Sequence, residues 1–409
     1  MKTKRSLSTV VVIAAVAAVA LTACGSSKSS SKTNSGTSGK TYTIAYQGPL
    51  SGGNAQLGLN MEYSVQLAVQ QANSGTSQFG KLPFTLKFTK QDDQGSATQA
   101  PTAAQALIGD SSVMGVVGVA FSSAAKASGP FYSQANLATV SPSATAPDLA
   151  DNGWKNFYRV VADDNAQGPA DAQYLAKVVK ATNVYVVDDA SAYASGLATA
   201  FKGAAGANNL KIESETAPGT TQCQAGNGNV QQYDALASKV KNANPQAVFY
   251  AGYYCDFALL AKSLKSAGFT GTLMSDDGSL DPKFVSQAGA SVANDTLISC
   301  ACSVLGSSGE ATNFATQFKA LAGFAVGTYS AEAYDSANAI IDAMKQISSN
   351  GGAITRDAVV TALKSVDFKG LSKEVKFESN GNIAGTAVYV NKVENGTITQ
   401  LGLVSDLAK

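Results

Sequence analysis

The stretch TYTIAYQGPLSGGNAQLGLNMEYSVQLAVQQAN, residues 41–73, puts a short β-rich run directly before a longer amphipathic one. Tyr42–Tyr46 has the aromatic and β-branched residues that favour a strand. The second half predicts a helix with one buried face, because apolar residues recur in it at helical spacings: Met61, Val65, Ala68, Val69 and Ala72. A strand that leads into a helix is the unit from which parallel sheets are built.

The same alternation continues through most of the chain. We expect strands over residues 84–90, 113–119, 138–140, 183–187, 247–250 and 296–299. We expect helices over residues 97–108, 192–207, 230–242 and 257–267. Because strands that alternate with helices of about 10 to 15 residues are typical of right-handed crossovers, the sequence predicts parallel sheets with helices on both faces.

Towards the C-terminus the pattern changes. Two helices are expected over residues 328–348 and 354–365, followed by a turn-rich cluster at 377–382 and strands over 386–390 and 397–401. Turn residues next to short strands favour antiparallel pairing. The sequence therefore predicts an antiparallel addition to an α/β chain.

The N-terminus has the pattern of an exported lipoprotein. A basic start is followed by an uncharged apolar run that ends in Leu21-Thr22-Ala23-Cys24. The run of about 12 residues is shorter than the roughly 20 that a membrane-spanning helix needs, so residues 1–23 are predicted to be a cleaved signal peptide. A cysteine at this point resembles the bacterial lipobox, which implies lipid attachment at Cys24 and anchoring to the outer face of the cell membrane. The alternative is an ordinary secretory peptide in which Cys24 is incidental.

Composition indicates how the rest of the chain is organised and which partners it lacks. Residues 24–40 consist almost wholly of Ser, Gly, Thr, Lys and Asn, and we expect them to form a flexible tether. Residues 41–409 are long enough for two domains. Without the signal peptide, 27 Lys and Arg stand against 29 Asp and Glu, and this balance indicates no nucleic-acid partner.

The absence of histidine from the sequence excludes Ser-His-Asp catalysis, Cys-His catalysis and His metal sites. Ser123-Ala-Ala-Lys126 matches the S-x-x-K motif of penicillin-binding enzymes, but the S-D-N and K-T-G partners of that motif are missing. We therefore expect a protein that is not an enzyme and that uses no cofactor and no metal.

Four cysteines follow Cys24, and an even number in an exported chain predicts two disulfides: Cys223, Cys255, Cys300 and Cys302. One alternative closes Cys300 on Cys302 and leaves Cys223 with Cys255. Another joins Cys255 to a cysteine of the 300 region across adjacent strands. Reduced, buried thiols and a zinc site are the remaining alternatives.

Polar and aromatic residues follow three of the expected strands and the stretch that ends at Leu273: Phe121-Ser122-Ser123, Ser141-Pro-Ser-Ala-Thr145, Gly252-Tyr253-Tyr254 and Asp276-Asp277-Gly278. Open α/β sheets bind ligands outside the carboxyl ends of their strands, so these segments predict a cleft. Hydroxyls and helix N-terminal amides in the first two suit a carboxylate, and an acid in the last suits an ammonium. Each segment also has a simpler interpretation as a helix cap, a core edge or a turn.

Several motifs carry a family resemblance: Gly48-Pro-Leu-Ser-Gly52, Gln56-Leu57-Gly58, Asp92-Asp93, Ser141-Pro-Ser-Ala-Thr-Ala-Pro147, Tyr250-Ala-Gly-Tyr-Tyr254, and Tyr329 with Tyr334-Asp335. In this order and spacing they resemble the leucine/isoleucine/valine-binding family of ABC transporter solute-binding proteins, of the type I periplasmic-binding fold. The resemblance implies two Rossmann-like lobes with parallel sheets, joined by a three-crossing hinge. It places the N-terminal lobe at residues 41–161 plus 304–375 and the C-terminal lobe at 162–303 plus 376–409.

The same resemblance implies the binding residues. Ser122 and Thr145 would hold a ligand α-carboxylate, with Ser123 beside them and the amide of Ala144 or its neighbour assisting. From the second lobe Tyr193, Tyr253 and Asp277 would face the ligand, with Asp277 on the α-amino group. The ligand side chain would lie near Leu57 and Tyr329.

Two departures from the family bear on the ligand. Leu57 stands where branched-chain binders usually have an aromatic residue, and Asp277 stands in place of a longer glutamate. We expect a monomeric, lipid-anchored protein that closes on a small zwitterion, an amino acid of the branched-chain type, and delivers it to an ABC permease. The alternatives are a binder of the same fold for an amide, urea or aromatic acid, a ligand-sensing surface lipoprotein, and an exported enzyme.

Overall fold

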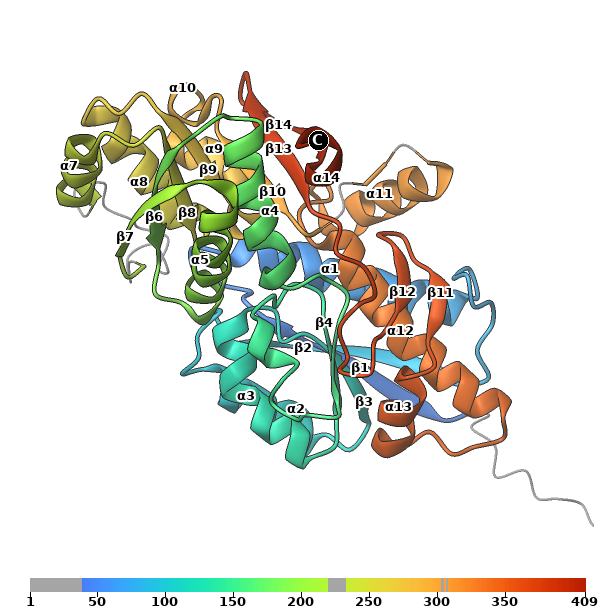
Figure 1. The fold of residues 1–409 in the computed structure, drawn as a ribbon. Helices are drawn as coiled ribbons and strands as arrows, with labels where there is room; N and C mark the ends of the chain where they lie inside the picture. Colours follow the sequence, from blue (N-terminus) through green and yellow to red (C-terminus); the bar gives the residue numbers. More distant parts are fainter. Residues whose placement is uncertain (1–38, 220–232, 303–304, 307) are drawn as a thin grey trace, which may run out of the picture. The chain divides into compact units, whose positions relative to one another are not determined.

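Two sheets organise the chain, and the first is wholly parallel (Figure 1). The computed structural model describes residues 39–219, 233–302, 305–306 and 308–409. The first sheet has the strand order β2-β1-β3-β4-β5, and its strands are β1 (Thr41–Gly48), β2 (Thr85–Asp92), β3 (Val113–Val117), β4 (Ala138–Ser141) and β5 (Phe157–Arg159). On one face lie α1 (Ala55–Ser74), α12 (Ser330–Ser349) and α13 (Arg356–Leu363). On the other lie α2 (Ala100–Gly109) and α3 (Ser122–Gln134).

The second sheet has the order β14-β13-β10-β9-β8-β6-β7. Its parallel strands are β6 (Asn183–Asp188), β7 (Lys211–Thr216), β8 (Ala247–Ala251), β9 (Thr272–Ser275) and β10 (Leu297–Cys300). The antiparallel pair β13 (Tyr389–Glu394) and β14 (Thr397–Leu403) extends the sheet beyond β10. The helices packed with this sheet are α4 (Asp164–Lys177), α5 (Ala192–Ala205), α7 (Asp234–Ala243), α8 (Tyr254–Ser266), α9 (Pro282–Ala288), α10 (Ala290–Ala293) and α14 (Val404–Leu407).

Both sheets use the same strand order in their parallel part, second-first-third-fourth-fifth. The chain passes between the sheets three times: before α4, after β10, and between the small hairpin of β11 (Asp367–Lys369) and β12 (Glu374–Lys376) and strand β13. The helix α11 (Gly309–Ala322) and the 3-10 turns at Pro147–Leu149, Gly206–Asn208 and Asp277–Ser279 complete the described elements. The predicted fold class, paired parallel α/β units with three crossings, is confirmed.

The buried face predicted for the first helix is confirmed. Met61, Val65, Ala68, Val69 and Ala72 are all buried in the core beside the first sheet. The antiparallel C-terminal pair is confirmed as well, although its first strand begins at Tyr389 rather than at residue 386, because pairing with β10 starts there. This part of the architecture follows directly from apolar periodicity.

Other element boundaries were predicted wrongly. The third strand ends at Val117, because Gly118 turns the chain with a φ of +129° and donates its N–H to Val140. Helix α8 begins at Tyr254, three residues before the predicted start, since Tyr253 is the extended residue that precedes it. The sequence did not predict α4, α11 or β7 at all.

The structure describes three of the four cysteines in the second half of the chain. A disulfide joins Cys300 to Cys302, and Cys255 is also disulfide-bonded. This arrangement agrees with the alternative that closes Cys300 on Cys302, and the pairing of the other two cysteines stays a prediction. Cys223 lies outside the described residues.

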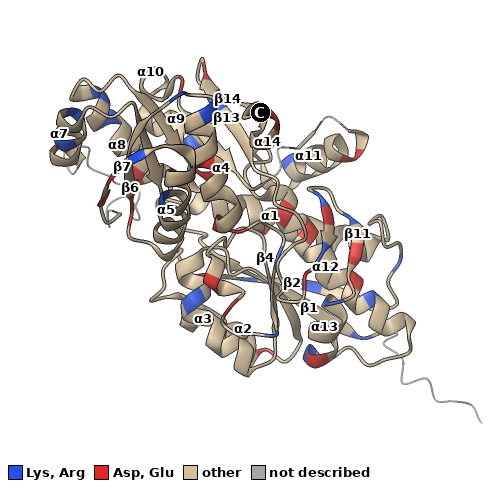
Figure 2. Cartoon of the chain, viewed as in Figure 1, with Lys and Arg blue, Asp and Glu red and all other residues tan. Residues whose placement is uncertain are grey.

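The N-terminal predictions also fall outside the described residues, because the description begins at Gly39. The signal peptide, the lipid site at Cys24 and nearly all of the tether stay predictions, as do the lobe boundaries. Among the described helices, none combines the length and the apolar character that crossing a membrane requires. Basic and acidic residues are interspersed over the elements that Figure 2 draws, in line with the near-neutral balance of the sequence.

Candidate functional site

The strand order fixes where the candidate site residues gather. In each sheet the order reverses beside the first strand, at β1/β3 and at β6/β8. Loops that follow strands on the two sides of such a switch point diverge and leave a crevice at the carboxyl edge of the sheet. Leu57, Ser122, Tyr193 and Tyr253 all lie just after the strands of these two switch points.

One small cavity brings these strand ends together. Its lining residues come from the segments that follow strands of both sheets and from the start of α12: Leu57, Ala120, Phe121, Ser122, Ser143, Tyr193, Tyr253, Asp277, Gly278 and Tyr329. Six of the nine predicted ligand-binding residues are in this lining. The cavity holds only about 10 Å³, roughly the space of one water molecule. A larger ligand therefore requires the walls to separate.

The carboxyl group of Asp277 is the polar centre of the cavity. Its Oδ1 accepts a hydrogen bond from the Tyr193 hydroxyl at 2.7 Å, and its Oδ2 accepts one from the Tyr329 hydroxyl. Tyr193 follows β6, whereas Tyr329 directly precedes α12 and adopts a left-handed backbone conformation with a φ of +66°. We call this arrangement the tyrosine clamp.

A second acid, Asp276, lies next to the clamp. Its Oδ2 accepts the N–H of Gly252 at 2.9 Å, whereas its Oδ1 is buried, lies beside the Tyr193 hydroxyl and has no hydrogen-bond partner at good geometry among the described residues. Burial raises the pKa of Asp276 well above its ordinary value and also raises the pKa of Asp277. The described lining of the cavity contains no Lys or Arg to offset these acids. A ligand ammonium would supply both the missing donor and the missing positive charge.

Gly252 makes this packing possible. Its φ of +154° lies in a region that L side chains rarely adopt, and a Cβ there would lie 2.6 Å from the Tyr250 hydroxyl and 2.8 Å from Asp189 Oδ2. Only glycine lets the backbone approach these side chains so closely. Its N–H can then reach Asp276 from the end of β8.

Of the hydroxyls predicted to hold a carboxylate, only that of Ser122 lines the cavity. Ser122 Oγ accepts the N–H of Ala146 at 3.2 Å, so its own proton remains to be donated. Thr145 does not line the cavity; among the described residues its buried Oγ1 has no hydrogen-bond partner at good geometry, and it lies beside the Asp164 carboxyl. Ala144 donates its N–H to Ser141 Oγ at 3.0 Å, so the assisting role predicted for this amide requires that bond to break.

Ser123 lies outside the small cavity and makes a contact between the two halves of the site. Its Oγ accepts the N–H of Ala192, at the start of α5, at 3.0 Å. A second such contact runs from the Tyr254 hydroxyl to the carbonyl of Gly53 at 2.6 Å. Both join loops that follow strands of different sheets.

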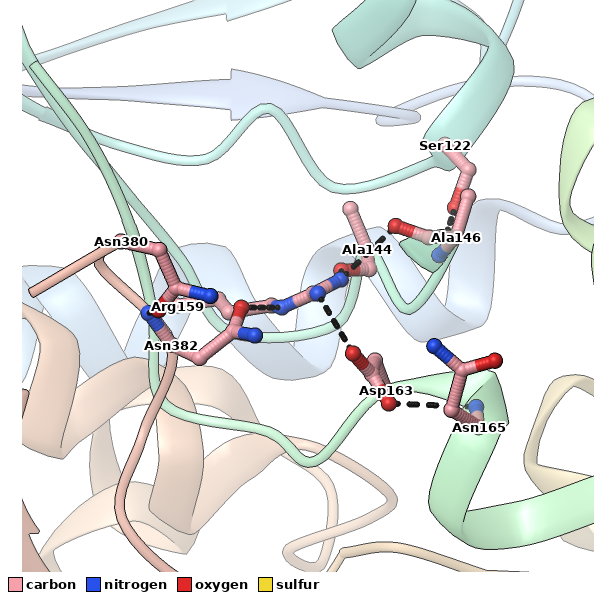
Figure 3. A network of polar contacts seen from close by, with 8 residues as sticks. All are labelled: Ser122, Ala144, Ala146, Arg159, Asp163, Asn165, Asn380 and Asn382. Atoms are coloured by element: carbon pink, nitrogen blue, oxygen red, sulfur yellow. Dashed lines mark hydrogen bonds and ion pairs between the residues drawn. The ribbon is translucent and has the colours of Figure 1, made fainter. Parts of the chain in front are cut away.

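A buried arginine holds the loop that carries Thr145 (Figure 3). Arg159 Nη1 donates to the carbonyls of Ala144 and Ala146, at 3.2 and 2.9 Å. Its Nε donates to Asn382 Oδ1 at 2.7 Å, and its Nη2 pairs with Asp163 at 3.1 Å. The guanidinium therefore ties this loop to two of the segments that cross between the sheets.

Three buried polar residues of α4 were missed in the sequence: Asp164, Gln167 and Asp171. Both carboxyl oxygens of Asp164 and of Asp171 lack hydrogen-bond partners at good geometry among the described residues. Burial raises the pKa of both acids well above the ordinary value. Their spacing of three and four residues places them on one helix face, a signal that polar periodicity contained.

A family model for periplasmic binding proteins matches residues 41–397. The chain belongs to the periplasmic binding protein family. The Leu/Ile/Val-binding protein BraC3 of Rhizobium johnstonii is 28% identical over 361 residues, which cover 87% of this chain and 92% of that protein.

Two solved structures share the fold of this periplasmic binding protein. The branched-chain amino acid transporter substrate-binding protein LivJ of Streptococcus pneumoniae, in complex with isoleucine, aligns with a TM-score of 0.77 at 24% identity, covering 89% of this chain and 100% of that one. A solute-binding protein of an ABC transporter from R. palustris, in complex with benzoate, aligns with a TM-score of 0.75 at 18% identity, covering 89% and 96%.

The buried acids of this periplasmic binding protein predict that its stability falls as the pH rises. Burial raises the pKa of Asp93, Asp189 and Asp281 to about 6 and that of Asp335 to about 7. The folded state then holds more protons than the unfolded state above pH 4, and each pKa unit corresponds to about 1.4 kcal/mol. Thermal unfolding should give a Tm that decreases from pH 5 to pH 7. A Tm that increases over this range would contradict the assignment.

Proposed function

We propose that this chain is the extracytoplasmic solute-binding protein of an ABC importer and that it binds a small zwitterion, an amino acid. The observation that carries the proposal is the cavity at the strand ends of both sheets, which has the buried carboxyl group of Asp277 and the hydroxyl of Ser122 in its lining. A zwitterion presents the complementary pair of charges. Branched-chain amino acids are the first class to test, because the named relatives bind them.

The chemistry at each end of the ligand follows from the side chains present. Asp277, with Asp276 beside it, would accept the N–H groups of the α-ammonium, and the ligand would displace the Tyr329 hydroxyl from the clamp. On the other side, Ser122 and Thr145 would donate their hydroxyls to the α-carboxylate. Each buried charge then has a partner, which a site that excludes water requires.

The proposal also covers how the protein closes on the ligand and delivers it. The two lobes, residues 41–161 plus 304–375 and 162–303 plus 376–409, would close on the ligand by bending at the three crossings. Lipid on Cys24 would keep the monomer close to a permease in the membrane. The role is binding and delivery, without turnover of the solute.

Aromatic rings give a second candidate ligand class, an aromatic acid. Tyr253 stacks on Phe121 with ring centroids 4.3 Å apart and is tilted against Tyr193 at 5.4 Å. Such rings provide a flat apolar wall for a planar ligand, and a carboxylate could still use the hydroxyls of Ser122 and Thr145. A binder of an amide or urea would use the same donors and acceptors.

Isothermal titration calorimetry of the purified chain from residue 39 onwards tests the proposal. The panel should contain leucine, isoleucine, valine, the other amino acids, benzoate, urea and acetamide. We expect saturable 1:1 binding of α-amino acids, with no binding of the matching α-keto acids, because these lack the ammonium that Asp277 accepts. If benzoate or an amide binds and every amino acid fails, the amino-acid assignment is wrong.

A further inference from the structure

We propose that Gln167 of α4 is a positioning residue, whose side-chain amide holds the Asp277 carboxylate in place for a ligand ammonium. This inference rests on the proposed function and deepens it, because it concerns the same acid. Gln167 does not line the small cavity, so it acts through Asp277 rather than on the ligand itself. The observations behind it are the place of Gln167 in the fold, its contacts, and the charged groups around Asp277.

The register of the second sheet places Gln167 beside Asp277. Strands β9 and β10 are parallel neighbours, and their register puts Ser299 level with Asp276, the first residue after β9. Asp277 comes next, and the turn that it opens packs against β10. Gln167 Nε2 donates to Ser299 Oγ at 3.0 Å. The amide is therefore anchored next to the strand end that Asp277 follows.

The amide of Gln167 also has an N–H to spare for Asp277. A side-chain amide carries two N–H groups on one nitrogen, and the bond to Ser299 uses one of them. Burial raises the pKa of Asp277, and hydrogen bonds from the clamp tyrosines and from Gln167 counteract this rise. Gln167 is fully buried. Its amide is thus a further donor to Asp277 beside the two hydroxyls of the tyrosine clamp.

This donor gains importance when the ligand arrives. Under the proposed function, the ligand ammonium takes the place of the Tyr329 hydroxyl on Asp277. Tyr193 and Gln167 then remain as side-chain donors to the acid. Hydrogen bonds to the charged form of a carboxyl group favour that form, and the charged form is the one that pairs strongly with an ammonium. The amide of Gln167 therefore keeps Asp277 ready for the ligand.

The groups around Asp277 add to its need for donors. Its titratable neighbours among the described residues are three acids and three tyrosines: Asp164, Asp171, Asp276, Tyr193, Tyr253 and Tyr329. Arg159 faces Asp164 from β5. All three neighbouring acids are buried, and a negative charge on any of them disfavours a charge on Asp277. The ionised form of Asp277 thus depends on its hydrogen-bond donors.

Calorimetric titration of the best amino acid into Gln167→Met at several pH values tests the inference. Methionine has a similar length but no donor. The ligand stays zwitterionic between about pH 5 and about pH 8, so the change in Kd comes from the protein. We expect the variant to bind within about threefold of the wild type at about pH 8 and about tenfold more weakly at about pH 5. The sign follows because loss of a donor raises the pKa of Asp277, which then takes up its proton at a higher pH.

Two further variants complete the comparison. Ser299→Ala keeps the amide of Gln167 and removes only its anchor, so the weakening at low pH should have the same direction and be smaller. Gln71→Met is the matched control, since Gln71 is a buried glutamine of α1 that bonds Gln317 at 3.0 Å and does not line the small cavity. It should leave the Kd unchanged at each pH. A Tm measurement on each variant shows whether it is folded, and Ser299→Ala decides the question if Gln167→Met is not.

The outcomes separate this inference from the proposed function. If the wild type binds amino acids and Gln167→Met weakens binding by the same factor at every pH, Gln167 has only a structural role. The inference is then overturned, and the proposed function stands. A variant that binds as tightly as the wild type at every pH overturns it in the same way. If the wild type binds no α-amino acid, the proposed function is wrong and this inference falls with it.

Discussion

The Asp277→Asn variant should lose amino-acid binding by about 2–5 kcal/mol, which is between roughly 30-fold and several thousandfold in Kd. Asparagine keeps the size of the side chain and one acceptor oxygen, but it lacks the charge that an ammonium needs in a buried site. Its amide nitrogen would instead point a donor at a second donor. Calorimetric titration of the best amino acid into both proteins measures the difference.

The same chemical change at an exposed acid provides the control. Asp367→Asn removes only a surface ion pair with Lys376, so it should leave the affinity within a factor of two. Tyr329→Phe is informative in the other direction, since it removes the hydroxyl that competes with the ligand for Asp277. Unchanged affinity in Asp277→Asn, with the fold intact, would show that this carboxylate does not hold the ligand.

The Arg159→Met variant should be the most destabilising single change near the site, by about 3–5 kcal/mol. Methionine fills part of the volume but leaves the carbonyls of Ala144 and Ala146 and the Asp163 carboxylate without their buried donor. Unfolding in urea, followed by circular dichroism, measures the loss. Ligand affinity should fall as well, since the loop that carries Thr145 loses its support.

The Arg356→Met variant tests whether burial of the guanidinium causes the large loss of stability expected for Arg159→Met. Arg356 also donates to three backbone carbonyls, those of Val113, Ile108 and Asp110, but it is only partly buried and lies away from the cavity. Water can replace these bonds, so a loss of about 1 kcal/mol with unchanged ligand affinity is expected. Equal losses in both arginine variants would contradict the special role assigned to Arg159.

Much of the fold could be predicted from local pattern. The apolar spacing of Met61, Val65 and Ala72 matches the buried face of α1, and the β-rich runs match most strands. The positions of Ser122, Tyr253 and Asp277 after their strands also followed from pattern, because sheet topology brings carboxyl ends together. Whether these residues bind a ligand is what the variants above decide.

The rest depended on tertiary contacts that no local pattern contains. Helix α4 carries Gly168 and Pro169 and buries Asp164 and Asp171, so neither its propensity nor its polarity predicts a core helix. The tyrosine clamp joins residues 52 and 84 positions apart in the chain. The sharing of Phe121 between two cavities is likewise visible only in three dimensions.

The stacked rings of Phe121 and Tyr253 belong to two neighbouring cavities at once. Both rings line the small cavity and a larger one of about 280 Å³, so a substitution in either ring changes both cavities. Under the proposed function, a change in either ring would therefore alter the surroundings of the ligand and the larger cavity together. A lineage that moves to a new solute has to change these rings and their neighbours in concert, or adapt through residues such as Leu57 and Asp189 that line one cavity only.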